Sequence, residues 1–205
     1  MMYAFRLIFG VIIVGLSSFS VANGPLKTVP NLDIDSYMGE WHQIAAIPAW
    51  FQRKCVANTT ATYEHTGDYV RVTNSCMKQD GKKNVASGLA RINKKYSDSA
   101  RLQVTFASIF GKWIWWFQGD YWVMDLDEGY TTSIVGHPDR KYLWILSREK
   151  ELTREKLQEL EGKISGQYYD TCNINITQEG DLKGASLCSL AKDKSLEGGQ
   201  VRGEK

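Results

Sequence analysis

The sequence predicts an all-β protein. Eight strands are expected to form an antiparallel meander, arranged either as a sandwich or as an up-and-down barrel. Apolar and polar residues alternate with a period of two in eight segments of the chain. Short turns, some of which place glycine next to aspartate, separate these segments. A single segment of helical periodicity follows the last of them. Together these observations predict a meander followed by one helix.

Each expected strand is bounded by a turn or a proline. The first ends at Pro48, "HTGD" joins the second and third, and Asp80-Gly81 separates the third from the fourth. "DEGY" and "HPDR" divide the last three strands. The strands are expected at Trp41–Ile47, Val56–Glu64, Tyr69–Met77, Val85–Asn93, Ala100–Phe106, Asp120–Leu126, Thr131–His137 and Lys141–Ser147.

The helix is expected within Leu152–Gln167. Thr153 is a good N-cap, because its hydroxyl can accept a hydrogen bond from a free backbone amide of the first turn. Leucines and an isoleucine recur at helical spacing on one face, which predicts packing against the outside of the sheet. The alternating segment Cys172–Gln178 is expected to add an edge strand. The residues of the apolar face are Leu157, Leu160 and Ile164.

The chain is expected to be one exported domain. Arg6, an apolar run over 7–16 and small residues up to Ala22 have the pattern of a signal peptide, and the run is short of the roughly 20 residues of a membrane span. We expect a signal peptide at 1–22, one domain at 23–188 and a polar, disordered tail at 189–205. No cysteine near residue 22 could carry a lipid anchor, so we expect a periplasmic or secreted protein.

Composition excludes several classes of function. The formal net charge is +2 and no basic stripe stands out, so nucleic acid is not an expected partner. The three histidines and four cysteines do not cluster and form no CxxC pair, so we expect no metal and no cofactor. No Ser-His-Asp grouping or phosphate-binding loop indicates an enzyme.

Several motifs, in a fixed order, resemble the lipocalin family. Gly39-x-Trp41 opens the first strand, "DEGY" (127–130) stands before the seventh, and "YLWILSRE" places Arg148 at the end of the eighth. "GDYWVMDLD" and "DRKYLWILSR" are similar to the branch of bacterial lipocalins and apolipoprotein D, and the resemblance spans residues 31–178. It implies an eight-stranded antiparallel up-and-down β-barrel with one C-terminal α-helix and a short extra strand. It also implies that Arg148 lies over the Trp41 indole at the closed end.

Two departures from the family pattern are visible. "DEGY" lacks the threonine of the family's Thr-Asp-Tyr-like turn. Many bacterial members are outer-membrane lipoproteins, and this chain lacks the cysteine for that modification.

By this resemblance, the barrel lumen binds, stores or transports a small hydrophobic ligand such as a fatty acid or lysophospholipid, in the maintenance of bacterial envelope lipids. Residues that face the lumen recur at every second position along each strand. A tyrosine hydroxyl among them is expected to orient the ligand. Three alternatives stay open: a solid core, an enzyme that uses a lumen thiol, and an envelope interaction protein with a filled barrel. The lumen candidates are Ala61, Tyr63, Tyr121, Val123, Trp144 and Leu146.

The even number of cysteines in an exported chain predicts two disulfides. Cys55 and Cys76 lie at nearly matched distances on either side of the "HTGD" turn, which favours pairing them. Cys172 and Cys188 then form the second bridge. The alternative, found in many lipocalins, joins a barrel cysteine to the C-terminal segment.

The segment Phe106–Trp122 is unusually rich in large apolar residues for a loop. It either folds over the barrel as a local cluster or forms a patch that touches a membrane or a second copy, so both monomer and homodimer stay open. Arg53 and Lys54, in the loop after the first strand, are either solvated or contact a ligand headgroup. The patch candidates are Trp113, Trp115, Trp116 and Phe117.

Overall fold

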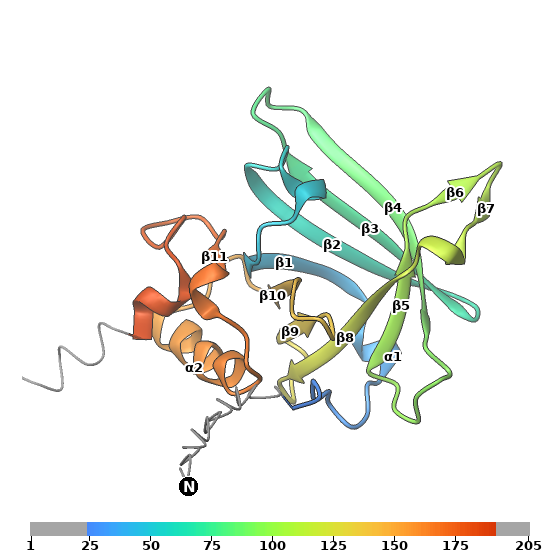
Figure 1. The fold of residues 1–205 in the computed structure, drawn as a ribbon. Helices are drawn as coiled ribbons and strands as arrows, with labels where there is room; N and C mark the ends of the chain where they lie inside the picture. Colours follow the sequence, from blue (N-terminus) through green and yellow to red (C-terminus); the bar gives the residue numbers. More distant parts are fainter. Residues whose placement is uncertain (1–23, 192–205) are drawn as a thin grey trace, which may run out of the picture.

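A computed structural model describes residues 24–191 of the chain. Eight antiparallel strands are paired in the order β10-β9-β8-β5-β4-β3-β2-β1, and β10 also pairs with β1. This last pairing, with His42 opposite Ser147 and Ala46 opposite Trp144, closes the sheet into a barrel (Figure 1). The predicted barrel is therefore confirmed and a sandwich is excluded. The barrel strands are β1 (Gly39–Ala46), β2 (Ala57–Thr66), β3 (Tyr69–Met77), β4 (Lys83–Ile92), β5 (Arg101–Thr105), β8 (Gly119–Leu126), β9 (Thr132–Gly136) and β10 (Leu143–Ser147).

The connection between β5 and β8 contains a small hairpin that the sequence did not predict. β6 (Ser108–Ile109) pairs with β7 (Lys112–Trp113), and a 3-10 helix, η2 (Trp115–Phe117), follows. Figure 1 shows the hairpin standing away from the barrel wall. Gly111 at its tip has a positive φ of 75°, a conformation that glycine adopts without steric cost.

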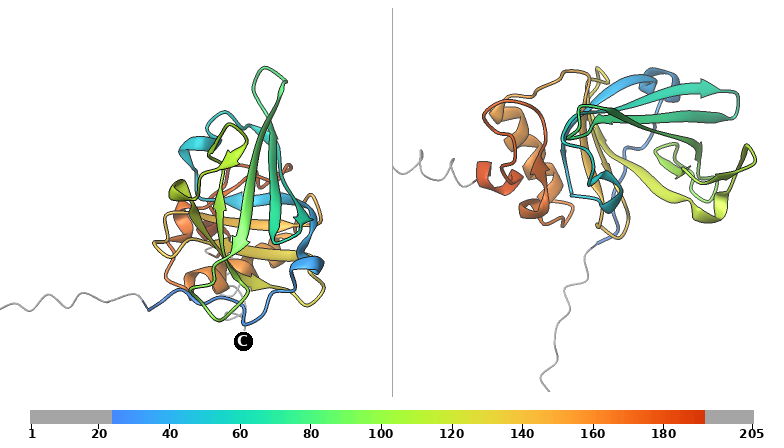
Figure 2. Two further views of the ribbon diagram at one scale, coloured as in Figure 1. Left: turned by 90° about the vertical axis from the view of Figure 1, so that its right-hand side faces the viewer. Right: turned by 90° about the horizontal axis from the view of Figure 1, so that it is seen from above.

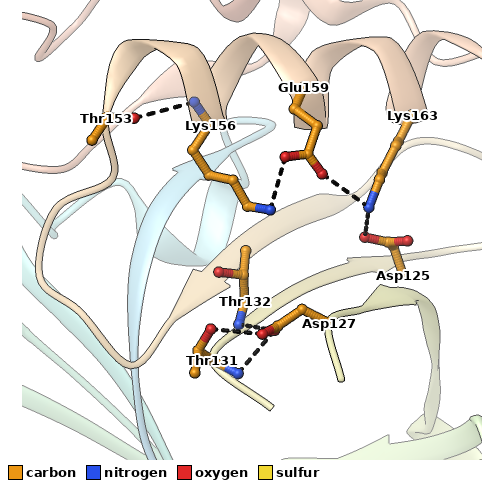
Figure 3. A network of polar contacts seen from close by, with 8 residues as sticks. All are labelled: Asp125, Asp127, Thr131, Thr132, Thr153, Lys156, Glu159 and Lys163. Carbon is orange, nitrogen blue, oxygen red and sulfur yellow. Dashed lines mark hydrogen bonds and ion pairs between the residues drawn. The ribbon is translucent and has the colours of Figure 1, made fainter. Parts of the chain in front are cut away.

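The predicted helix is α2 (Arg154–Ser165), and it lies outside the barrel in the view from above (Figure 2). The Thr153 hydroxyl accepts a hydrogen bond from the Lys156 amide at 3.3 Å, as its N-cap position requires. Figure 3 shows the polar side of the helix, where Lys163 Nζ donates to Asp125 Oδ2 of β8 at 2.8 Å. The apolar side packs in one cluster with Ile44 and Ile145, whose side chains face out of the barrel, and its buried residues are Leu157, Leu160 and Ile164.

The elements after the helix fasten it to the barrel. A 3-10 helix, η3 (Thr171–Asn173), leads into the expected edge strand β11 (Asn175–Ile176), which pairs with β1. A helical turn at 187–191 then buries Leu187 and Leu190 in the cluster beneath α2. The packed domain thus continues past residue 188, where we expected it to end. The expected signal peptide (1–22) and the rest of the expected tail (192–205) lie outside the described residues.

Both disulfides of the favoured pairing are present. Cys55 is bonded to Cys76 across the start of the β2–β3 ladder, with Cα atoms 5.5 Å apart. Cys172 is bonded to Cys188 with Cα atoms 4.8 Å apart, which ties the turn after α2 to the final helical turn. Neither bridge joins the barrel to the C-terminal segment.

Candidate functional site

One end of the barrel is sealed by Trp41 and Arg148. The Trp41 side chain is fully buried, and its Nε1 donates to the carbonyl of Tyr37, in the short helix α1 (Ile34–Tyr37), at 2.9 Å. The Arg148 guanidinium carbon lies 3.9 Å from the centre of the indole ring. The guanidinium also donates to the carbonyls of Met38 at 2.6 Å and Glu40 at 2.8 Å. These contacts place a buried ring and main chain across this end of the barrel.

Gly39 holds the main chain against that guanidinium. It has a positive φ of 96°, and a Cβ built on it would lie 3.1 Å from Arg148 Nη1. Replacement with alanine is therefore expected to lower the free energy of unfolding by about 2–3 kcal/mol, of which about 1–2 kcal/mol is backbone strain. Gly67→Ala is the matched control, because Gly67 has a φ of 64° but nothing within 4 Å of its Cβ position. Chemical denaturation of both variants checks this; equal losses would show that the Arg148 contact adds nothing.

A cavity of about 530 Å³ lies between the closed end and the opposite mouth. Five of the six lumen candidates line it, and the sixth, Val123, does not. Val123 faces inward, as alternation along β8 predicts, but it lies two residues nearer the closed end than Tyr121. There it is fully buried in the core with Trp41. The candidates on the cavity wall are Ala61, Tyr63, Tyr121, Trp144 and Leu146.

The floor of the cavity is a chain of hydroxyl groups. Tyr121 Oη lies 2.9 Å from Tyr63 Oη and 2.9 Å from Tyr37 Oη. Tyr37 Oη lies 3.2 Å from Ser133 Oγ, which donates to the Asp125 carbonyl at 3.3 Å. If each hydroxyl donates to the next, from Tyr63 to Ser133, every donor in the chain has an acceptor.

Burial keeps this floor uncharged. It raises the pKa of Tyr37, Tyr63 and Tyr121 above the ordinary tyrosine value, because an ionised phenolate would lose its hydration. The floor is therefore polar in composition, but it is neutral and satisfied by its own hydrogen bonds. The ligand-orienting hydroxyl expected at Tyr63 or Tyr121 is already engaged within this chain.

The wall formed by β1 and β10 is held together by amides and aromatic rings. Trp144 Nε1 donates to Gln52 Oε1 at 3.2 Å, and Gln52 Nε2 donates to Gln43 Oε1 at 2.8 Å. These bonds fasten the 3-10 helix η1 (Trp50–Gln52) to the wall beside the mouth. Tyr142 stacks on Trp144 with ring centres 6.0 Å apart. The result is a largely aromatic wall whose polar atoms are paired with one another.

Comparison with known proteins identifies the family to which this barrel belongs. The family model described as "Lipocalin-like domain" matches residues 32–179, which is most of the chain. The chain is a lipocalin. Lipocalins bind small hydrophobic ligands, so the cavity is the site expected for that activity.

Individual relatives place this lipocalin within the family. It is 34% identical over 157 residues to temperature-induced lipocalin-1 of Arabidopsis thaliana, covering 76% of this chain and 84% of that protein. It is 33% identical over 170 residues to the outer membrane lipoprotein Blc of Escherichia coli K12, covering 82% and 90%. Apolipoprotein D of Macaca fascicularis is 27% identical over 158 residues, covering 73% and 78%. The predicted bacterial and apolipoprotein D-like branch is confirmed.

The solved structure of insecticyanin from the tobacco hornworm Manduca sexta has the same fold. It superposes with a TM-score of 0.60 at 22% identity, covering 78% of this lipocalin and 88% of insecticyanin. At this identity the likeness establishes the barrel and nothing about the ligand.

The mouth of the lipocalin contains several residues that sequence reasoning missed. The exposed rings of Trp50, Phe51 and Phe106 line the cavity near its opening. A Cβ at Gly88 would lie 2.8 Å from the Phe106 ring, so glycine at this position lets the ring rest on the inner face of β4. The sequence did contain a signal for Gly88: it occupies an inward-facing position of a strand. A glycine at such a position often marks a place where another group packs closely against the backbone.

The four patch candidates differ in exposure. The Arg91 guanidinium lies 3.9 Å from the ring centre of Trp115, and Tyr69 stacks on the same ring at 5.9 Å. Trp115 is thereby packed against the outer wall and is only partly exposed, as is Trp113. Trp116 is 89% exposed, and Phe117 is exposed at the mouth while also lining the cavity.

Proposed function

We propose that this lipocalin stores or transports one single-chain lipid, a fatty acid or a lysophospholipid, with its acyl chain in the barrel lumen. The observation that carries the proposal is the mainly apolar cavity, whose lining also includes amides and hydroxyls, above a neutral floor of mutually hydrogen-bonded tyrosines. Its volume falls within the range of about 300–1,000 Å³ found for small-molecule sites. Each methylene moved from water into such a cavity contributes about 0.8 kcal/mol of binding free energy.

The distribution of charge argues that the chain enters tail first. Of the residues that line the cavity, only Asp120 is a Lys, Arg, Asp or Glu. Asp120 alternates with the inward Tyr121, and its strand partner is Gln103, whose side chain bonds Arg91. Its carboxylate therefore faces away from the lumen. A carboxylate or phosphate at the floor would be desolvated without a cation, which costs several kcal/mol, so the headgroup stays at the mouth.

An open cavity above a floor whose hydroxyls bond to one another favours a carrier over an interaction protein with a filled barrel. All four cysteines of the chain are in disulfides, including Cys55 and Cys76 on the cavity wall. The enzyme alternative needs a free lumen thiol, and this arrangement offers none. We therefore propose a binding role without catalysis.

The disulfides indicate an oxidising, exported compartment. Across residues 24–191, each helix is too short or too polar to span a bilayer. We propose that the lipocalin works in the periplasm or outside the cell, in the maintenance of bacterial envelope lipids.

Stearic acids that carry a nitroxide near the carboxylate or near the terminal methyl test the orientation. Tail-first binding predicts that a water-soluble paramagnetic relaxant reaches the bound nitroxide near the carboxylate and is shielded from the one near the methyl. Electron paramagnetic resonance of the two complexes measures this difference. The opposite order of accessibility would contradict the proposed orientation, and two freely tumbling spectra would contradict lumen binding itself.

A further inference from the structure

Exposed large apolar side chains are concentrated at the mouth of the barrel. Among the described residues, nine of the twelve lie on the mouth connections or at the adjoining start of β4. Large exposed apolar side chains that gather at one end of a domain mark a contact surface. Phe110 and Trp116 are its most exposed members. The nine are Trp50, Phe51, Val56, Val85, Phe106, Ile109, Phe110, Trp116 and Phe117.

The same end of the barrel is cationic. Its four connections, residues 47–56, 78–82, 106–118 and 137–142, contain seven Lys or Arg and two Asp or Glu, a net charge of +5. The three connections of the closed end, residues 67–68, 93–100 and 127–131, contain two Lys or Arg and four Asp or Glu. The cationic mouth thus contrasts with an acidic closed end, although the whole chain has a net charge of only +2.

Some of these cations have partners of their own. Lys78 pairs with Asp80 and Lys141 with Asp139, while Arg140 donates to the carbonyls of Gln167 and Gly24. The remaining four have no carboxylate partner in the part of the chain that the structure describes. They are Arg53, Lys54, Lys82 and Lys112.

We propose that the mouth docks on the surface of a bilayer that contains anionic lipids, with Phe110 and Trp116 inserted at the interface. Tryptophan favours the headgroup level of a bilayer, and each nearby cation strengthens binding to an anionic surface about fivefold. A second copy of the chain is a poorer partner for this face, because two mouths of charge +5 repel each other.

Docking in this orientation opens the cavity toward the membrane. Trp50, Phe51, Phe106 and Phe117 are each exposed at the mouth and also line the cavity, so apolar surface is continuous from one to the other. A lipid chain therefore passes between bilayer and lumen without crossing water. This transfer step rests on the proposed function; the docking itself does not.

Vesicle co-sedimentation of the full chain tests the docking. The variant Phe110→Ser/Trp116→Ser removes apolar surface without touching a residue that lines the cavity. Its control is Ile92→Ser, which removes an exposed apolar side chain at the closed end of β4. On vesicles of phosphatidylcholine and phosphatidylglycerol, we expect the mouth variant to bind at least about tenfold more weakly than wild type, and the control to bind as wild type does.

The charge is tested by Arg53→Gln/Lys54→Gln, for which we expect weaker binding to anionic vesicles and a smaller dependence on salt. Wild type that fails to sediment with anionic vesicles, or a mouth variant that binds as well as the control, would overturn the proposal. A dimer in light scattering that Phe110→Ser/Trp116→Ser converts to monomer, without vesicle binding, would assign the face to a second copy instead. Fatty-acid titration of the same variants without vesicles reports lumen binding separately, so the two proposals fail independently.

Discussion

Replacing Trp41 with alanine is expected to lower the free energy of unfolding by about 3–5 kcal/mol, because a fully buried indole is removed from the closed end. The loss has three sources that act together. The core around the indole loses its packing, the Arg148 guanidinium loses the ring 3.9 Å away, and the hydrogen bond to the Tyr37 carbonyl disappears. Denaturant unfolding followed by circular dichroism measures the change.

Trp116→Ala is the control for this variant. It deletes the same side chain from a position that is 89% exposed, so the expected change is within about 0.5 kcal/mol. A Trp41→Ala protein about as stable as Trp116→Ala would contradict the assignment of Trp41 and Arg148 as the seal of the barrel.

Ala86→Trp is expected to weaken binding of a single-chain fatty acid at least about tenfold while leaving the barrel folded. Ala86 lines the cavity but is exposed to its space and not packed in the core, so a larger side chain displaces ligand and not protein. Titration with a fluorescent fatty acid, together with thermal unfolding, separates lost affinity from lost structure.

The neighbouring residue supplies the control. Ser87 faces the opposite side of β4, is exposed and does not line the cavity, so Ser87→Trp adds the same indole to the outside. We expect it to bind the fatty acid as wild type does. Equal affinities for Ala86→Trp and Ser87→Trp would place the ligand outside the lumen.

The alternation of apolar and polar residues predicted the strands of this fold, because each strand has one packed face and one face that is polar or exposed to solvent. The same signal does not reveal closure, since the pairing of β1 with β10 joins residues about a hundred positions apart. The resemblance carried by Gly39, Trp41 and Arg148 supplied the barrel. The β6–β7 hairpin escaped prediction because its strands have two residues each and therefore show no period.

The site was predicted in part. The alternation of residues identified the inward side of each strand, but it does not show how far along the barrel axis a residue lies. Val123 was therefore grouped with Tyr121, although it lies beneath the cavity. Tyr37 was missed because it enters the floor from a short helix and not from a strand. The bond between Gln43 and Gln52 depends on where η1 folds, and no local pattern encodes it.

Native mass spectrometry of the lipocalin purified without detergent tests the central claim most directly. We expect a complex with one bound molecule whose mass, after release, is that of a fatty acid or a lysophospholipid. Ser87→Trp should retain this molecule and Ala86→Trp should lose it. Protein that carries no lipid and takes up none when fatty acid is added, or that keeps its lipid equally well in both variants, would contradict the account.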